Sequence, residues 1–94
     1  MEFDWDDANQ EHIAQHDIDP DEAEDAVLDE DALDFPTHRG PKSERRFGVL
    51  GKALSGRVLI VILEERKNKF RVVTARVAEK EERSLYDKEK QNPK

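Results

Sequence analysis

The amino-acid sequence predicts an α+β domain: an antiparallel sheet with two helices before it and one helix after it, in the order β-α-α-β-β-β-α. Helix start signals occupy the first third of the chain, and runs of β-branched residues separated by short turns follow from residue 45. A charged segment, residues 78–91, closes the chain as a helix. The 94 residues suffice for one domain, which we place at residues 1–91, and we expect residues 92–94 to fray.

The first segment, EFDW at residues 2–5, alternates acidic and aromatic residues. This alternation predicts a short edge strand with Phe3 and Trp5 facing inward. A helix is then expected from Asp6 to about His16, with Asp6 or Asp7 near its N-terminus, where the helix dipole favours a carboxylate.

The start of the second helix is marked more sharply. Asp19 can cap the helix, Pro20 suits the first helical position, and Glu22 would complete an acidic capping box. The residues at helical spacing that we expect to face the core are Ala23, Ala26, Val27 and Leu28.

Two prolines and a glycine make DFPTHRGPKSE, residues 34–44, the longest irregular stretch. A strand is expected over residues 45–53, broken near Gly51, and a turn follows around residues 54–56. The near-continuous apolar run at residues 57–65 is typical of a central strand that is covered on both faces.

Residues 66–69 turn the chain into a third strand, FRVVTAR at residues 70–76, which completes a meander. In the closing helix over residues 78–91, Glu79 and Arg83 have the i, i+4 spacing that favours an ion pair.

The charge is divided unevenly along the chain. Residues 1–36 carry 15 Asp and Glu and no Lys or Arg, a net charge of -15. Residues 37–94 carry 16 basic and 8 acidic residues, a net charge of +8, so the two parts sum to -7. The acidic half is either an ordinary solvated face or a docking surface for a basic protein, whereas the basic half can meet phosphates.

Composition also excludes several classes of protein. The chain has no cysteine, which rules out a disulfide framework, a thiolate nucleophile and a cysteine-ligated metal. Its longest apolar run, residues 58–63, is far shorter than the about 20 residues that a bilayer requires. Because the first residues are acidic where a signal peptide would be basic, we expect a cytoplasmic protein.

The third predicted strand and the closing helix carry a cluster of candidate catalytic residues: Arg71, Arg76, Arg83 and Tyr86. Arginine can clamp a phosphate with two hydrogen bonds and offset charge that develops on it, so the cluster would suit cleavage of an RNA phosphodiester. Tyr86 could assist proton transfer. The alternative is structural, with Arg83 paired to Glu79 and Arg76 paired to a carboxylate beside the core.

Strict alternation separates the two strand arginines. It places Phe70, Val72, Thr74 and Arg76 on one face of the strand, and Arg71, Val73 and Ala75 on the other. Only a bulge or a strong twist would bring Arg71 to the same phosphate as Arg76, so Arg76 is the first candidate for chemistry.

His12 and His16 lie four residues apart on the first predicted helix, a spacing that could hold a metal if a third ligand came from elsewhere. The alternative is two solvated histidines, one of them near the helix C-terminus, where a protonated imidazole is favoured. We expect no metal site.

Four segments of the chain together resemble the BrnT family of type II toxins: WDDANQEHIAQHDIDPDEAEDAV at residues 5–27, RRFGVLG, GRVLIVIL and RVVTARVAEKEERSLY. The shared pattern is a first helix opened by tryptophan and ended by histidine, an acidic second helix, an arginine-glycine strand, and a closing R-[IV]-[IV]-[ST]-A-R … E-R … Y segment. The resemblance covers about residues 3 to 86 in one order.

The resemblance implies a fold similar to RelE-like and barnase-like small ribonucleases, and a metal-independent endoribonuclease activity without a cofactor. It also implies a partner, an antitoxin with a ribbon-helix-helix DNA-binding part, bound through the acidic N-terminal half. The complex would repress its own operon, so the toxin would meet DNA only through the antitoxin.

The family pattern also assigns the site. Arg46 matches the arginine of the first meander strand, and the other matching positions are Arg71, Arg76, Arg83, Tyr86 and His16. Arg45 and Lys52 on the first meander strand are predicted to bind RNA together with Arg46. Many members have lysine-histidine-glycine where this chain has Gln15-His16-Asp17, and the alternative is therefore an inactive interaction protein that serves as co-repressor.

Overall fold

The computed structural model describes residues 1–37 and 45–91, so residues 38–44 of the predicted loop and the predicted fraying tail, 92–94, lie outside the described residues. The helices are α1 (Asp7–Ala14), α2 (Pro20–Leu28) and α3 (Lys80–Gln91). The strands are β1 (Leu33–Phe35), β2 (Arg46–Lys52), β3 (Val58–Arg66) and β4 (Lys69–Val77). They form one antiparallel sheet in the order β1-β2-β3-β4, which confirms the predicted α+β fold.

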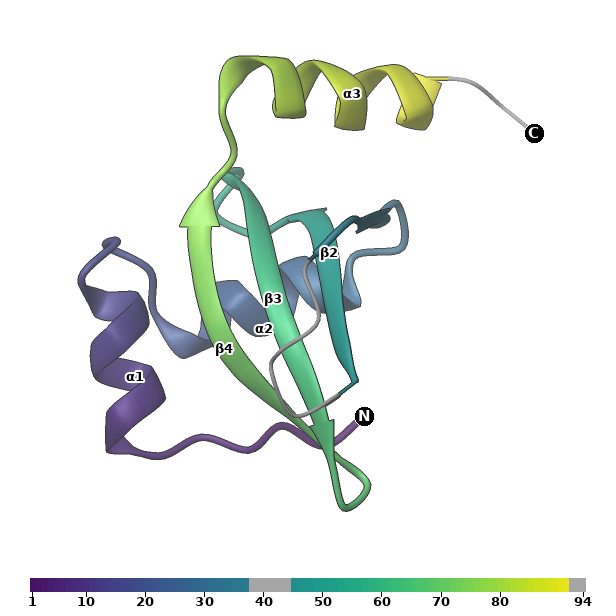
Figure 1. The fold of residues 1–94 in the computed structure, drawn as a ribbon. Coiled ribbons are helices and arrows are strands. Elements are labelled where there is room, and N and C mark those ends of the chain that lie inside the picture. The colour runs from purple at the N-terminus through teal and green to yellow at the C-terminus, as the bar shows by residue number, and fades with distance from the viewer. Residues whose placement is uncertain (38–44, 92–94) are drawn as a thin grey trace.

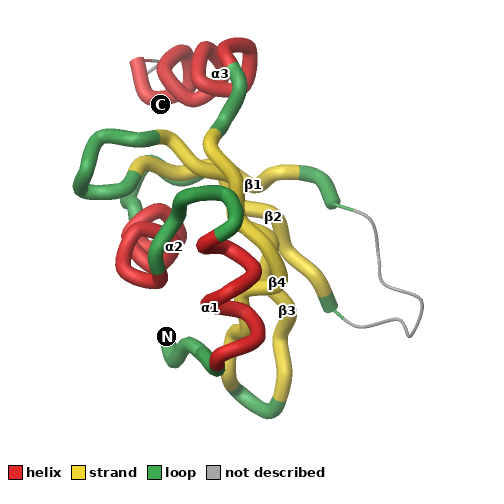
Figure 2. The backbone as a smooth tube through the Cα atoms, turned by 90° about the vertical axis from the view of Figure 1, so that its left-hand side faces the viewer, coloured by secondary structure: helices red, strands yellow, loops and turns green. Residues whose placement is uncertain are grey.

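The helices cover the two faces of the sheet unequally. Helices α1 and α2 lie on one side of it, and α3 crosses one end (Figures 1 and 2). We call the side that carries Leu59, Val61 and Leu63 the helix-covered face, because these residues pack in one cluster with residues of α1 and α2. The opposite side, which carries Ile60 and Glu64 of β3, we call the open face.

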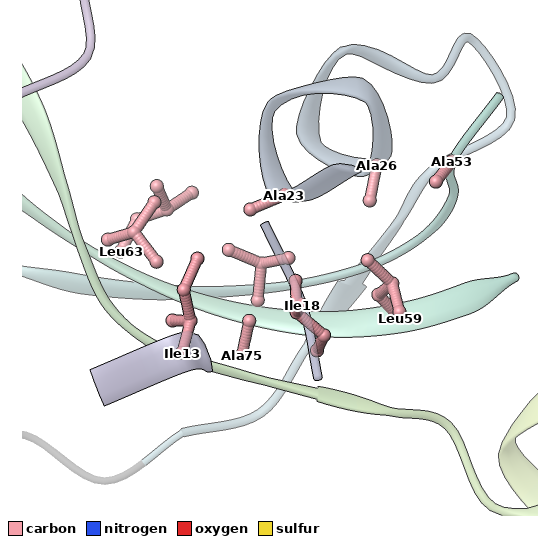
Figure 3. Close-up of a cluster of buried hydrophobic side chains, with 10 residues drawn as sticks. Ile13, Ile18, Ala23, Ala26, Ala53, Leu59, Leu63 and Ala75 are labelled. Atoms are coloured by element: carbon pink, nitrogen blue, oxygen red, sulfur yellow. The ribbon is translucent and has the colours of Figure 1, made fainter. Parts of the chain in front are cut away.

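The main core lies between the helix-covered face and the two N-terminal helices. Figure 3 shows Ile13 and Ile18 flanking Ala75, while Ala26 of α2 points toward the strands and Ala23 lies in the same cluster. A second cluster lies on the open face under α3, where Tyr86 packs against Leu50, Val58, Ile60 and Ala78. The rest of the open face has no helix over it among the described residues.

Helix α1 begins as predicted but ends early. Asp6 caps it through a hydrogen bond from the Asn9 backbone, and the Asn9 side chain accepts one from the Asp6 backbone, which is a capping box. The helix ends at Ala14, so His16 lies in the turn that follows the helix and is not its last residue.

Helix α2 confirms two predictions and corrects two. Asp19 is its N-cap and Pro20 its first residue. However, the Glu22 side chain does not reach back to the N-cap; it binds Arg57 and Ser55 instead, so the predicted acidic capping box is wrong. Leu28, predicted to face the core, is 58% exposed, because it lies at the end of the helix.

The first meander strand is continuous through Gly51, where a break was predicted. A Cβ atom at Gly51 would lie 2.0 Å from the Ala26 carbonyl oxygen of α2, so the glycine permits close packing of helix on strand. A further strand, Leu33–Phe35, pairs with β2 where the sequence predicted the start of an irregular stretch.

The N-terminal segment forms less sheet than expected. It makes one isolated bridge, from Phe3 to Phe70, rather than a strand of several residues. Phe3 and Trp5 nevertheless pack against the main core, as predicted. The Trp5 indole also donates a hydrogen bond to Glu24, 2.7 Å away, which links the segment to α2.

Candidate functional site

A β-bulge in β4 decides which arginines share a face. Thr74 pairs with Ile62 and Val72 pairs with Leu63, which leaves Val73 as an extra residue between them. From Val72 back to the start of β4, each side chain therefore points to the side opposite to the one that strict alternation from Arg76 predicts. Val72 therefore joins Ala75 in the main core, and the prediction that put Val72 opposite Ala75 is wrong.

The reversal also moves Arg71. It pairs with Glu64 and Arg76 pairs with Ile60, and these two partners lie four residues apart on the regular strand β3. Because paired residues in an antiparallel sheet point to the same side, Arg71 and Arg76 both lie on the open face. The prediction that simple alternation separates them is therefore wrong.

The buried Asn9 side chain of α1 supports the bulge. Its Nδ2 donates hydrogen bonds to the Val72 carbonyl, 3.2 Å away, and to the Asp4 carbonyl, 3.0 Å away. Phe70, two residues before Val72, bonds through its backbone to Glu2 and Asp4, so the Val72 carbonyl likewise points to the outer edge of β4, and the Asn9 contact satisfies this buried acceptor. The first turn of α1 thereby fixes the irregular part of β4.

A row of charged residues crosses the open face from β2 to β4. Arg46 and Arg71 are the paired neighbours of Glu64 on either side. The Glu64 side chain is buried, and its Oε2 lies 3.4 Å from Arg46 Nε. Arg66 also donates to Glu64. The row brings together Arg46 and Arg71, both predicted as site residues.

Arg71 and Arg76 are each held by a carboxylate from a neighbouring helix. Arg71 donates through both Nη atoms to Asp6, at 2.9 and 3.1 Å, and Arg76 donates through both Nη atoms to Glu82, each at 2.8 Å. Both carboxyl groups have a pKa below the ordinary value, first because of the hydrogen bond from the arginine. The alternative prediction, Arg76 paired with a flanking carboxylate, matches this geometry.

The remaining predicted basic residues are spread more widely. Arg83 is exposed and donates to the Ala78 carbonyl, 2.9 Å away, rather than forming the expected pair with Glu79. Lys52 Nζ lies 5.9 Å from the centre of the Tyr86 ring. Arg45 pairs with Glu65 at 3.3 Å, and since Glu65 follows Glu64 on β3, that pair points away from the open face.

Tyr86 is part of the core, 1% exposed. Its hydroxyl donates to Asp29 Oδ2, 2.5 Å away, and the same oxygen accepts the Lys52 backbone N–H. Burial first, and then the hydrogen bond to Asp29, raises the pKa of the phenol well above its ordinary value. A buried, protonated phenol is a poor proton acceptor, so we leave Tyr86 out of the chemistry proposed below.

The two histidines lie beside the β4 edge. Both are exposed, and their ring centres are 5.9 Å apart in an edge-to-face arrangement. His12 Nε2 lies 3.1 Å from Thr74 Oγ1, whereas His16 makes no such contact with β4. Across residues 1–37 and 45–91 no group of three His, Cys, Asp or Glu side chains is placed to hold a metal ion.

Many carboxylates of the acidic half are already engaged inside the protein. Those that accept hydrogen bonds are Asp6, Asp19, Glu22, Glu24, Asp25 and Asp29. The first third of the chain is therefore acidic partly because these side chains cap helices and tie α1 and α2 to the sheet.

Sequence reasoning overlooked three of the residues that shape this face: Glu64, Asp6 and Glu82. Asp6 was predicted only as a residue at a helix start, and Glu82 received no role of its own within the predicted charged helix. Glu64 had one available signal, because a carboxylate directly after the apolar run at 58–63 is placed to continue a buried strand.

Comparison with known proteins places the chain in a family. No curated protein matches it. No helix among the described residues is both long and apolar enough to cross a membrane. Residues 5–82 match the family described as "Ribonuclease toxin, BrnT, of type II toxin-antitoxin system", which is well over half of the chain. Because that match runs from Trp5 through the bulged strand to Glu82, the chain belongs to the BrnT family of ribonuclease toxins of type II toxin-antitoxin systems.

Proposed function

We propose that this protein is a cytoplasmic, metal-independent endoribonuclease that cleaves RNA by attack of a ribose 2'-hydroxyl on the neighbouring phosphate. Its phosphate site is the open face, with Arg46, Arg71 and Arg76 as the binding groups. Arg83 of α3, which is exposed and bound to the Ala78 carbonyl, is a further candidate for binding RNA.

The observation that carries the proposal is the bulge at Val73. Because of the bulge, Arg71 and Arg76 lie on the same side of the sheet as Arg46. Three guanidinium groups on one surface are suited to binding a polyanion. A sheet built only to cover a core would gain nothing from three cations on its less covered face.

The chemistry requires charge stabilisation and two proton transfers. The 2'-oxygen bonds to phosphorus as the bond from phosphorus to the 5'-oxygen breaks, which leaves a 2',3'-cyclic phosphate and a 5'-hydroxyl. Arginines stabilise the charge that builds on the phosphate oxygens. A general base takes the 2'-hydroxyl proton, and an acid gives a proton to the departing 5'-oxygen.

We assign proton transfer to the histidines at the end of α1. His16 matches the family motif, and His12 lies closer to the open face through its contact with Thr74. Histidine is the side chain best suited to exchange protons near neutral pH.

The test uses the full chain, purified without a partner protein, and a single-stranded RNA substrate. We expect cleavage that persists in EDTA, products with 2',3'-cyclic phosphate and 5'-hydroxyl ends, and a loss of about 100-fold or more in Arg76→Ala. Lys88→Ala, on the exposed part of α3, is the matched control. No cleavage by the purified chain and no growth arrest when it is expressed alone would reject the proposal.

The second candidate function is a catalytically inactive partner that acts as co-repressor. The observation that favours it is the pairing of Arg71 with Asp6 and of Arg76 with Glu82, since a carboxylate already occupies the donors that a phosphate needs. Tight binding to a neighbouring DNA-binding protein, with a gain in operator affinity and no nuclease activity, would select this function.

Either function needs the antitoxin that the family implies. We propose that it has a ribbon-helix-helix DNA-binding part and contacts the acidic half of this chain. The exposed carboxylates of α1 and α2, such as Asp7, Glu11 and Asp21, are suited to a basic segment. Reversing these charges to lysine is expected to weaken the complex without unfolding the protein, which a binding titration measures.

A further inference from the structure

Glu64 is the most deeply buried charged residue of the open face, yet the proposed chemistry gives it no part. It is 1% exposed, although it lies on the side of β3 that α1 and α2 leave uncovered. A buried carboxylate costs several kcal/mol of desolvation unless cations and hydrogen bonds surround it, and an apolar residue would avoid that cost. Its presence therefore calls for an explanation beyond stability.

The contacts of Glu64 supply that explanation. Its Oε2 accepts from Arg46 Nε, its Oε1 accepts from Arg66, and Arg71 is its cross-strand neighbour. Its charge also contributes to raising the pKa of Arg71, after the larger effect of the Asp6 hydrogen bond. One carboxylate thus gathers cations that would otherwise repel each other on adjacent strands.

Arg46 is held in a way that differs from Arg71 and Arg76. Glu64 engages its Nε, so that both Nη groups stay available, and they make no hydrogen bond to any residue among 1–37 and 45–91. In Arg71 and Arg76 both Nη groups already bind a carboxylate. An arginine fixed by Nε and open at both Nη groups is prepared for two hydrogen bonds to a phosphate.

We propose that Glu64 is a positioning residue that fixes Arg46 with both Nη groups directed to a phosphodiester of single-stranded RNA, and that Arg46 makes the first strong contact with the substrate. Glu64 itself does not touch the RNA. The proposal rests on the proposed function for the identity of the ligand, whereas the geometry of Arg46 does not depend on cleavage.

The experiment measures binding separately from cleavage. The probe is a single-stranded RNA oligonucleotide with 2'-deoxyribose at every position that could be cut, titrated at several salt concentrations. We expect Glu64→Gln and Arg46→Ala each to weaken binding about 10-fold and to reduce the salt slope by about 0.7, which corresponds to one phosphate contact. The matched control is Glu65→Gln, the same change on the next residue, which should bind as the wild type does.

Two further measurements separate positioning from a fold defect. Glu64→Asp keeps the charge and should recover most of the binding, and Glu64→Gln in the Arg46→Ala background should cause no additional loss. In the protein without RNA, the NMR signal of Arg46 Nε–H should be sharp and protected from exchange in the wild type and lost in Glu64→Gln.

The outcomes distinguish this inference from the proposed function. If the wild type cleaves RNA and Glu64→Gln binds the oligonucleotide equally well, the inference is wrong and the proposed function stands. If the wild type binds through Arg46 and Glu64 without cleaving, the inference stands and the nuclease proposal falls. If the wild type binds no RNA, or the Arg46 signal is the same in Glu64→Gln, the inference is overturned.

Discussion

Arg71 and Arg76 lie on the same face of β4 although five positions separate them, because Val73 adds one residue to the strand without a partner. An odd separation in a regular strand would put them on opposite sides of the sheet. The bulge thereby adds Arg71 to the face that carries Arg46 and Arg76. Bulges commonly redirect a side chain in this way beside functional sites.

The first prediction concerns the anchor of the bulge. Asn9→Ala removes the hydrogen bonds to the Val72 and Asp4 carbonyls and one half of the α1 capping box. It should lower the free energy of unfolding by about 1–3 kcal/mol, since buried acceptors lose their donors. Urea denaturation measures this loss, and Gln10→Ala, on the exposed side of α1, should change it little. Equal stability of the two variants would show that Asn9 does not hold the bulge.

The second prediction concerns the carboxylate that competes for Arg76. Glu82→Gln removes the charge that holds both Nη groups, while Glu81→Gln removes an equal charge from an exposed neighbour. Partly exposed ion pairs are worth about 0.2–1 kcal/mol, so RNA affinity should rise by no more than about 5-fold in Glu82→Gln. A fluorescence titration against Glu81→Gln tests this. A fall in affinity would mean that Glu82 orients Arg76 rather than competing for it.

The third prediction separates structure from chemistry at Tyr86. Tyr86→Phe keeps the ring in the core and removes the hydrogen bond to Asp29, so it should cost about 1–3 kcal/mol of stability. Cleavage per folded molecule should be unchanged, because the hydroxyl is buried and bound. Activity measured at a temperature where the variant is fully folded checks both parts. A loss of 100-fold would return Tyr86 to the catalytic site.

The fourth prediction is a pH dependence of stability. Arg57 holds the pKa of Glu22 below its ordinary value of 4.5, first through their hydrogen bond. A carboxyl group whose pKa is lowered by folding stabilises the protein above its unfolded pKa, and that stability is lost as the pH falls from 4.5 through the folded value. Arg57→Ala should therefore flatten the dependence of the melting temperature on pH in this acidic range.

The matched control is Arg45→Ala. Its ion pair with Glu65 lies at the surface, where the arginine side chain is 76% exposed, so its removal should leave the acidic limb of the pH profile intact. If both variants behave alike, the Glu22–Arg57 pair does not contribute the expected stability.

The fifth prediction distinguishes the two histidines. If His12 exchanges protons with the substrate, His12→Ala should lower kcat and remove one limb of the pH–rate profile, while His16→Ala leaves that limb in place. Charged groups near them include Asp6 at the start of α1, its partner Arg71 on β4, and Asp17 after α1, so the profile should be recorded at high salt. The converse result would identify His16, as the family motif implies.

Much of the fold was predictable from local physical chemistry. Asp19 and Pro20 favour a helix start through local interactions that do not depend on the rest of the fold. The apolar run of β3 is typical of a central strand covered on both faces. Strand β1 was missed because Leu33–Phe35 has no β-branched residue and adjoins Pro36. Its pairing with β2 depends on tertiary contacts that no local pattern encodes.

The site was harder to predict than the fold. The arginines themselves could be named, but a bulge leaves no signature in FRVVTAR, since Val73 is as suited to a regular strand as Val72. Tyr86 could be named as a candidate, but an aromatic residue on a charged helix suits a core anchor and a catalytic group equally. The sequence alone does not reveal its packing against Leu50 and Ile60.

The anchoring of β4 by Asn9 has a consequence for how such chains diverge. A single inserted or deleted codon within the strand would invert the side on which Arg71 emerges, while Arg76 and the residues after it stayed in place. Two chains nearly identical along their length could then present different electrostatic surfaces to RNA. Percentage identity would not reveal the difference, whereas the number of residues between the two arginines of β4 would.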